Sequence, residues 1–297
     1  MNENIFAINN AASRIFEAAL EDRQGMKAKE YILERGIPEK SVSQFRLGYS
    51  VPDIEKRLKE AGFSGDDLVD SGLFGKNDCG TLWFRFPRRL TLPIRDAAGN
   101  ILGFGARILG QGNPKYLNTP ETEVFRKRSL LYGLKPHKKN FVVVCEGYMD
   151  VIALHEIGFN NAVATLGTSL TESHAELIAG ISQNVVLMYD MDKAGRTATE
   201  KAFATLRSKG LNVYVADLSP AKDPDEFIRH CQEEPREAVI ERVKKSFPAI
   251  EFLLEKMAVK EDGERDFKKA ADILLRNCSA QEALVIAKRV SKRQDSP

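Results

Sequence analysis

The stretch Phe141-Val-Val-Val-Cys-Glu-Gly-Tyr-Met-Asp150 decides the fold of this chain. Five apolar residues run without a polar break, and Glu146 and Gly147 follow them. A short apolar run closed by glycine predicts a fully buried strand of a parallel sheet. Glu146 would then lie at the carboxyl end of that strand, and Asp150 in the first turn of the next helix. Open α/β sheets bind their ligands at this edge.

Two further apolar runs repeat this pattern downstream. Residues 184–189 precede Asp190-Met-Asp192, and residues 211–216 are followed by Asp223-Pro-Asp225. Short apolar strands separated by helical segments predict βαβ units and a parallel sheet. We expect strands over 141–146, 161–166, 184–189 and 211–217, and helices over 148–157, 171–181, 194–209 and 224–232.

The strand ends carry six carboxylates, which would converge if the strands are neighbours in one sheet. Alternate residues of an extended segment point the same way, so Asp190 and Asp192 can share a target. Clustered carboxylates repel one another unless cations neutralise them, and hard oxygen ligands favour Mg²⁺ or Mn²⁺. The sequence therefore predicts a divalent metal site at this edge.

Three of these segments resemble the Toprim signature of bacterial DnaG-type primases: Glu-Gly-Tyr-Met-Asp at 146–150, Asp-Met-Asp-Lys-Ala-Gly-Arg at 190–196 and Asp-Pro-Asp at 223–225. Upstream segments at 95–107, 114–120, 125–127 and 131–134 resemble the polymerase core of the same family. The resemblance runs from about residue 5 into the last helices. It departs at Met191, where the family usually has glycine. We expect that side chain to face away from the metals.

The resemblance implies a DNA primase catalytic core, which makes short RNA primers from NTPs on single-stranded DNA by two-metal nucleotidyl transfer. Glu146, Asp190 and Asp192 would be the catalytic metal ligands. Asp150, Asp223 and Asp225 would complete the metal site or orient its ligands.

Charge is distributed unevenly along the chain. Residues 76–140 contain thirteen Lys and Arg against four Asp and Glu, whereas residues 141–235 contain seven against fourteen. This suits an enzyme that binds a polyanion beside its metals, although two ordinary solvated faces remain the alternative. Within the basic segment we expect a hairpin with its loop at 96–100, and close approach of other groups at Gly103 and Gly105.

The candidate nucleic-acid or NTP-binding residues are Arg35, among the N-terminal helices, and four polar side chains of the basic segment: Arg107, Lys115, Asn118 and Lys127. Arg35 lies in a Glu-Arg-Gly that resembles a nucleic-acid-contacting turn of the family, and the alternative is a solvated arginine at the end of a helix. Tyr116 and Phe125 lie among the basic residues, and each could either stack on a base or belong to the core.

We expect an α/β protein in three parts. Residues 1–138 would form a basic α+β subdomain that begins with short helices, 139–236 a Toprim subdomain with a parallel sheet and flanking helices, and 237–297 a small helical subdomain. The composition of the 297 residues, 43% hydrophobic and 29% charged, is ordinary for a globular protein.

The four cysteines are far apart, with no Cys-x-x-Cys, so we expect neither zinc in this chain nor a secreted disulfide framework. No apolar stretch approaches the ~18 residues of a membrane span, and a signal-peptide pattern is absent. We expect a soluble, cytoplasmic protein at the bacterial replication fork.

Two other functions are compatible with the acids. A Toprim nuclease would share the sheet but would not need the basic block from Lys115 to Arg128, and a non-catalytic DNA-binding module would keep the fold alone. For a primase the partners would be the single-stranded template, NTPs and the RNA primer. A replicative helicase or a zinc-ribbon domain would bind through segments absent here.

Overall fold

The computed structural model describes residues 2–190, 192–231, 233–258, 266–275 and 278–294. Met191, for which we predicted an orientation, lies outside them. The chain divides into two compact units, the first comprising 1–137 with 145–168 and the second 138–144 with 169–297. Glu146 and Asp150 therefore belong to the first unit, and the other predicted metal ligands to the second. The three-part division remains a prediction.

The first unit begins with helices, as the sequence predicts. They are α1 (Asn2–Glu21), α2 (Met26–Glu34), α3 (Glu39–Phe45), α4 (Ile54–Glu60) and α5 (Gly65–Asp70), with short 3₁₀ turns at Arg23–Gly25 and Lys127–Ser129 and a later helix α6 (Tyr148–Glu156). The helix after Pro38 ends at Phe45, because Arg46 adopts the left-handed conformation, with φ 54°. Gly48 begins a strand that packs closely against Phe16.

An antiparallel sheet forms the centre of this unit. Its strands are β1 (Gly48–Tyr49), β4 (Arg89–Arg95), β5 (Ile101–Ile108) and β6 (Tyr116–Asn118), in the order β1-β4-β5-β6. The predicted hairpin loop is confirmed, and Asp96 Oδ1 accepts a hydrogen bond from the backbone N–H of Asn100 at 2.9 Å. A separate two-stranded ribbon joins β2 (Phe74–Lys76) and β3 (Leu82–Phe84), and β8 (Ala162–Ala164) bridges to Tyr132.

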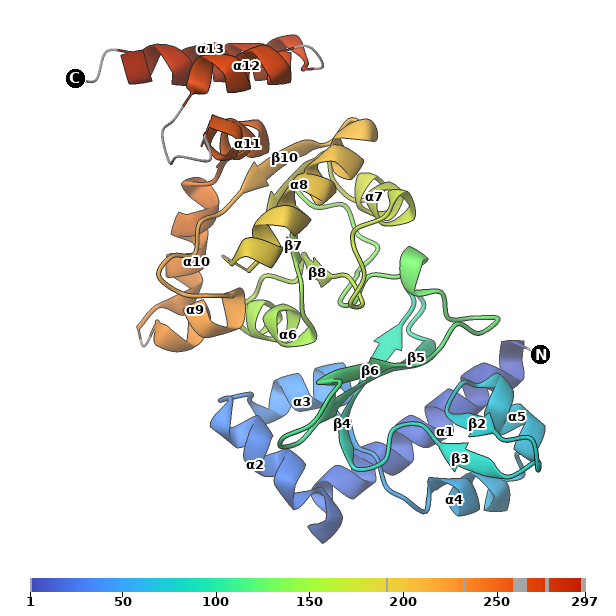
Figure 1. Cartoon of the computed structure of the whole chain (residues 1–297). Helices are drawn as coiled ribbons and strands as arrows, with labels where there is room; N and C mark the ends of the chain where they lie inside the picture. Colours follow the sequence, from blue (N-terminus) through green and yellow to red (C-terminus); the bar gives the residue numbers. More distant parts are fainter. Residues whose placement is uncertain (1, 191, 232, 259–265, 276–277, 295–297) are drawn as a thin grey trace. The chain divides into compact units, whose positions relative to one another are not determined.

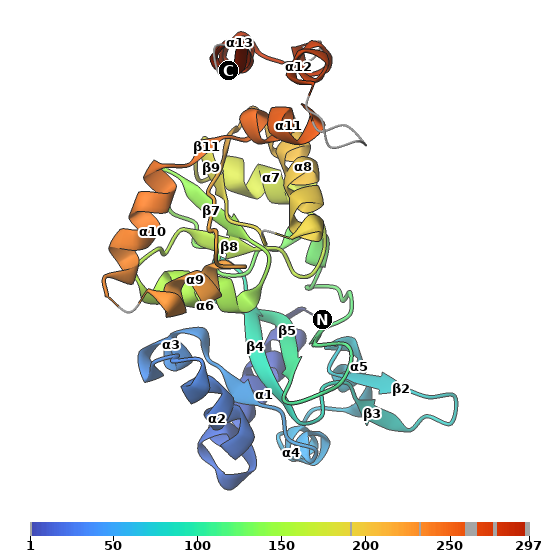
Figure 2. The ribbon, with the colours of Figure 1, turned by 60° about the vertical axis from the view of Figure 1, so that its left-hand side comes forward.

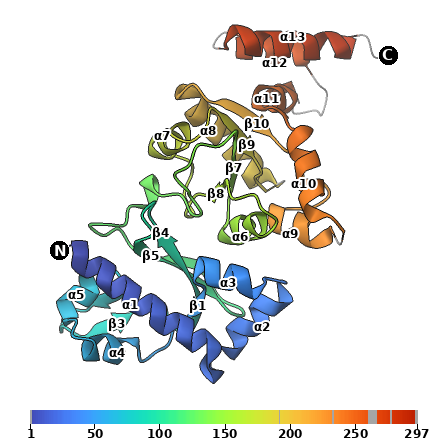
Figure 3. The ribbon, with the colours of Figure 1, turned by 180° about the vertical axis from the view of Figure 1, so that it is seen from behind.

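The core of the first unit lies between α1 and this sheet (Figure 3). Ile8, Ala12 and Phe16 recur every four residues, so they share one face of α1, and all three are buried. The ring of Phe16 meets that of Phe104 on β5 edge to face, with centroids 5.6 Å apart. This packing holds β5 in place, and β5 also contains Gly105 and Arg107, which belong to the candidate site described below.

The second unit contains the predicted parallel sheet. The strands of this sheet that belong to the second unit are β7 (Val142–Cys145), β9 (Asn184–Leu187), β10 (Asn212–Val215) and the short β11 (Phe247–Pro248), in the order β11-β10-β9-β7. The helices are α7 (Glu172–Ala179), α8 (Lys193–Ser208), α9 (Pro224–His230), α10 (Pro235–Lys244), α11 (Ala249–Ala258), α12 (Phe267–Leu275) and α13 (Ala280–Gln294). Every strand and helix predicted over 141–232 is present, with ends within two residues of the expected ones.

Helices cover both sides of this sheet. α7 and α8 lie on one side of β7, β9 and β10, and α10 lies on the other (Figures 1 and 2). The α/β class is therefore confirmed. Ion pairs connect α13 to α11: Arg289 lies 3.0 Å from Glu251 and 2.9 Å from Glu255. Among the described residues, no helix is both long enough and apolar enough to cross a bilayer.

Candidate active site

The carboxyl ends of three parallel strands line up at one edge of the sheet. Leu187 on β9 is in register with Val144 on β7 and with Val215 on β10. Asp190 follows Leu187 by three residues, and Glu146 follows Val144 by two. The shared edge predicted from the sequence is therefore confirmed for the strands.

Three of the predicted acids begin helices. Asp192 Oδ1 accepts from the N–H of Gly195 at 2.8 Å, and Asp223 Oδ1 accepts from Glu226 at 2.8 Å. Asp150 Oδ2 accepts from the N–H of Gly147 at 3.0 Å, within the first turn of α6. Each bond satisfies a backbone donor that a helix start would otherwise leave without a partner. Local hydrogen bonding thus holds these three carboxylates at the starts of α6, α8 and α9.

The other acids have different surroundings. Asp225 is buried and forms a two-point ion pair with Arg229, with its closer contact at 2.9 Å. Asp190 is half-buried, and Lys222 Nζ lies 3.9 Å from its Oδ2. Glu146 is half-buried directly after β7. A cationic side chain therefore lies beside two of the acids of the second unit.

The donors present suit a hard divalent cation, because all six are carboxylates. In the part of the chain that the structure describes, however, no three acidic, histidine or cysteine side chains are gathered closely enough to hold an ion. The strand ends are therefore aligned, while the metal site itself remains a prediction.

A basic and aromatic cluster lies on the first unit. The Arg107 guanidinium lies 4.3 Å from the centre of the Tyr31 ring and 5.5 Å from that of Tyr116, and Arg35 lies 5.3 Å from Tyr31. Cations favour the negative faces of aromatic rings, so the two tyrosines fix the Arg107 side chain between them.

Arg107 has unused hydrogen-bonding capacity. Its Nε and Nη1 atoms are buried and have no hydrogen-bond partner among the described residues. A buried donor without an acceptor is costly, and a guanidinium pairs best with a planar or tetrahedral oxyanion. The predicted role of Arg107 in binding nucleic acid or NTP gains a physical basis from this geometry.

The remaining candidates of this group lie on or near β6. Lys115 is exposed just before the strand, and Lys127 is half-buried in the 3₁₀ turn, where its backbone N–H donates to Glu121 Oε1 at 3.1 Å. Asn118 is half-buried at the end of β6, and its Nδ2 donates to the carbonyl of Leu166 at 2.8 Å.

Tyr148 connects the acidic turn to this cluster. Its hydroxyl donates to Asn118 Oδ1 at 2.5 Å, and its ring centre is 5.5 Å from that of Tyr116 and 4.7 Å from that of Tyr132. Burial raises the pKa of all three tyrosines, that of Tyr148 well above its ordinary value. All three hydroxyls therefore stay protonated at neutral pH.

For one of the two aromatic residues, Phe125, the structure decides between stacking and the core. Phe125 is fully buried, so stacking on a base is wrong for it and the core assignment holds. Tyr116 stays half-buried against Arg107. Sequence reasoning missed Tyr31, although its spacing of four from Arg35 on a helix was a usable signal. Tyr148 lies within the motif at 146–150, but no pattern in the sequence assigns it a role.

Both predicted close approaches in β5 are present. A Cβ built at Gly103 would lie 2.8 Å from Thr119 Oγ1, and one at Gly105 would lie 2.6 Å from Tyr148 Cζ. Neither position leaves room for a side chain. These glycines let β6 and the turn that carries Glu146 and Asp150 pack directly on β5.

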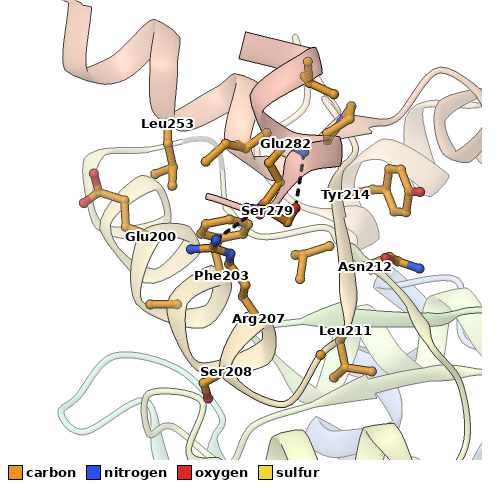
Figure 4. A pocket seen from close by; sticks show the side chains of 16 residues that line it. Glu200, Phe203, Arg207, Ser208, Leu211, Asn212, Tyr214, Leu253, Ser279 and Glu282 are labelled. Atoms are coloured by element: carbon orange, nitrogen blue, oxygen red, sulfur yellow. Dashed lines mark hydrogen bonds and ion pairs between the residues drawn. The ribbon is translucent and has the colours of Figure 1, made fainter. Parts of the chain in front are cut away.

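A cavity of about 840 Å³ lies elsewhere in the second unit, among α8, β10, α11 and the start of α13 (Figure 4). Its polar lining includes Arg207 and Glu282, which form an ion pair at 2.8 Å. Leu211 and Asn212 line it at the amino end of β10, whereas Asp223 follows the carboxyl end of that strand. The cavity is therefore separate from the strand ends that carry the acids.

Known families and proteins that are similar to this chain are DNA primases or contain a Toprim-like domain. Residues 15–138 match the family model of the DNA primase catalytic core N-terminal domain, and residues 143–228 match a Toprim-like family. A DNA primase of Clostridium acetobutylicum is 37% identical over 257 residues, which cover 84% of this chain and 42% of that protein. The chain thus spans less than half of this relative.

Two solved structures are similar over most of the chain. A DnaG primase catalytic domain bound to single-stranded DNA is 33% identical, with a TM-score of 0.77 covering 88% of this chain and 86% of that one. The zinc-binding and RNA polymerase domains of the Aquifex aeolicus primase are 29% identical, with a TM-score of 0.80 covering 100% of this chain and 73% of that one.

Proposed function

Because this chain belongs to the family of bacterial DnaG-type primase catalytic cores, we propose that it synthesises short RNA primers from NTPs on a single-stranded DNA template. The reaction is a nucleotidyl transfer, in which a 3′-hydroxyl attacks the α-phosphate of an NTP and pyrophosphate leaves.

One observation carries the proposal. Within the first unit, the turn that bears Glu146 and Asp150 is hydrogen-bonded through Tyr148 to Asn118, two residues from the Tyr116 that stacks on Arg107. Acids that suit a metal and cations that suit phosphates therefore belong to one packed body. Nucleotidyl transfer needs this combination, because triphosphate and metal must be held together.

The cations of this unit would bind the polyanions. Arg107 presents two buried nitrogens without acceptors among the described residues, which a phosphate oxygen would satisfy. Lys115 and Lys127 would add charge along the template or the triphosphate, and Arg35 would extend that surface. Asn118 would contact the NTP through its polar side chain. That a similar catalytic domain binds single-stranded DNA supports this assignment.

Divalent metal use is general in this family, and we propose Mg²⁺, with Mn²⁺ as a substitute. Glu146, Asp190 and Asp192 would bind it directly, and Asp150, Asp223 and Asp225 would complete or orient the site. The chemistry supplied by bound ions would be acidification of the attacking hydroxyl and neutralisation of the leaving pyrophosphate. The Asp192 and Asp223 caps would keep those carboxylates oriented.

The surroundings of the reaction follow from the same assignment. We propose that the protein works in the bacterial cytoplasm at the replication fork, with a replicative helicase and a zinc-ribbon domain as partners. The Aquifex aeolicus relative includes a zinc-binding domain. The four cysteines of this chain are well separated in sequence, so a zinc ribbon would come from another segment or protein.

The test is incorporation of labelled NTPs on a primed single-stranded template, with and without Mg²⁺. We expect metal-dependent extension that Asp190→Asn abolishes. A labelled template in the same reaction reports nuclease activity, and a gel shift reports binding. Degradation without synthesis would favour a Toprim nuclease, and DNA binding alone would favour a non-catalytic module. Either result would overturn the proposed function.

A further inference from the structure

Asn118 is held by hydrogen bonds at both ends of its amide. Its Oδ1 accepts from the Tyr148 hydroxyl at 2.5 Å, and its Nδ2 donates to the Leu166 carbonyl at 2.8 Å. An amide can rotate by half a turn and exchange its oxygen and nitrogen, but the Leu166 carbonyl can only accept, so it holds the nitrogen end. The Tyr148 hydroxyl donates to the oxygen end, and together the two partners hold the amide in one orientation.

We propose that Tyr148 is a positioning residue for NTP binding, which acts by holding the Asn118 amide in one orientation relative to the acidic turn. This rests on the proposed function and deepens it, since it gives the tyrosine between Glu146 and Asp150 a role distinct from that of the acids. Tyr148 itself touches neither metal nor substrate in this scheme.

The Tyr148 ring is seated firmly enough for this role. It is 5% exposed, and its Cζ and Oη atoms occupy the space that a Cβ on Gly105 would need. The ring of Tyr132 meets it edge to face with centroids 4.7 Å apart, and that of Tyr116 lies 5.5 Å away. Contacts from β5, from β6 and from Tyr132 thus restrict the direction in which the hydroxyl points.

The same short turn links Tyr148 to the acids. Asp150 Oδ2 accepts from the N–H of Gly147, which closes the turn around Tyr148. Movement of the Tyr148 ring would therefore disturb Asn118 on one side and the Asp150 cap on the other.

Tyr148→Phe, which keeps the ring and removes only the hydroxyl, tests the proposal. On a primed template we expect the KM for NTP to rise about five- to twentyfold, while kcat changes less than about threefold, because an amide held only at its nitrogen end is less well oriented for ground-state binding. A structural defect alone would lower the amount of active enzyme, and so kcat, without moving KM. An unchanged KM would overturn the proposal.

A double-variant cycle tests whether Tyr148 acts through Asn118. We expect Asn118→Ala to raise KM at least as much as Tyr148→Phe, and the double variant to match Asn118→Ala alone. If KM of the double variant instead rose by the product of the two single-variant factors, the residues would act separately, and this would overturn the proposal.

Tyr132→Phe is the matched control. Tyr132 is 3% exposed and packs against Tyr148, but its hydroxyl has no hydrogen-bond partner among the described residues. Removing that hydroxyl should leave KM within about twofold of the wild type. A rise equal to that of Tyr148→Phe would point to general loosening of the tyrosine cluster and against a specific hydrogen bond.

Binding of a non-hydrolysable ATP analogue, measured by calorimetry with Mg²⁺, separates this inference from the proposed function. Wild-type protein that binds the analogue without making RNA would overturn the function, and the inference would then be decided by the dissociation constant of Tyr148→Phe. Normal synthesis with an unshifted dissociation constant in that variant would overturn the inference alone. No binding by the wild type would overturn both.

Discussion

Replacing Gly105 with alanine tests whether the acidic turn packs on β5 as described. The backbone of Gly105 lies outside the left-handed region, so alanine can adopt it and the cost is steric. The new Cβ would lie 2.6 Å from Cζ and 2.7 Å from Oη of Tyr148. The Tyr148 ring would have to move.

The size of the effect follows from these distances. Ordinary contact begins near 3.4 Å, so the Cβ would be about 0.8 Å too close to Cζ. Overpacking of this kind costs roughly 1–3 kcal/mol. A ring displaced by that amount would also strain its 2.5 Å hydrogen bond to Asn118, whose loss costs about 1 kcal/mol. We expect Gly105→Ala to lower the free energy of unfolding by about 2–4 kcal/mol.

Urea unfolding measures this change, and two further variants make it specific. Gly65→Ala, at the start of α5, places its Cβ at the 3.4 Å of ordinary contact with Leu82, and should stabilise slightly, by up to about 1 kcal/mol. In a Tyr148→Ala background, Gly105→Ala should cost less than about 1 kcal/mol, because the clash is gone. An equal cost in both backgrounds would refute the packing argument.

Four further results are expected. Asp190→Asn and Asp192→Asn should each abolish RNA synthesis while the fold and DNA binding persist, since a lost metal ligand costs several kcal/mol in the transition state; near-normal synthesis by both in Mg²⁺ would remove that role. Single-stranded DNA affinity should fall with salt with a log–log slope near −2 to −3.5 for about three to five phosphate contacts, and Lys115→Ala with Lys127→Ala should flatten it; an unchanged slope would place the groove elsewhere. Above about pH 10 the unfolded chain releases the Tyr148 proton, whereas the folded state retains it because burial raises the pKa. In denaturant titrations the stability of the wild type should therefore fall with pH more steeply than that of Tyr148→Phe, by about 1.4 kcal/mol per pH unit. Parallel pH profiles of the two proteins would contradict the burial of Tyr148. Finally, the 297 residues alone should extend a supplied primer but initiate poorly, with little preference among template trinucleotides, unless a zinc-ribbon fragment is added; strong selective initiation without it would show that the core reads the template.

The sequence was most informative where local pattern and burial agree. β7 and β9 are almost fully buried and mostly apolar, so they could be located to within two residues, and β10 could be located as well although its Asn212 is exposed. The short strand β11 carries no such run: it is the pair Phe247–Pro248, and only its antiparallel pairing with β10 makes it a strand. Its existence depends on a neighbour, and local pattern therefore missed it.

Contacts between residues that are far apart in the sequence could not be predicted from local sequence patterns. Arg107 was identified as a candidate from its charge, but its pairing with Tyr31 joins a strand to a helix from another part of the chain. Phe125 sits among cations in the sequence, yet it is buried, with its ring against the space left by Gly103. Polarity of sequence neighbours does not decide burial, because burial depends on which backbone segments pack together.

The local hydrogen bonds of the acids also determine which substitutions are informative. Asp192 and Asp223 each accept from a backbone N–H at a helix start, so alanine would remove a cap together with the charge. Loss of such a cap costs about 1 kcal/mol, and would confound a catalytic defect with a folding defect. Asparagine caps helices nearly as well as aspartate but is a weaker, neutral ligand. If the Asp192→Asn variant keeps the stability of the wild type, it has lost only the charge. Any loss of synthesis in that variant then reports on the carboxylate as a metal ligand and not as a structural cap.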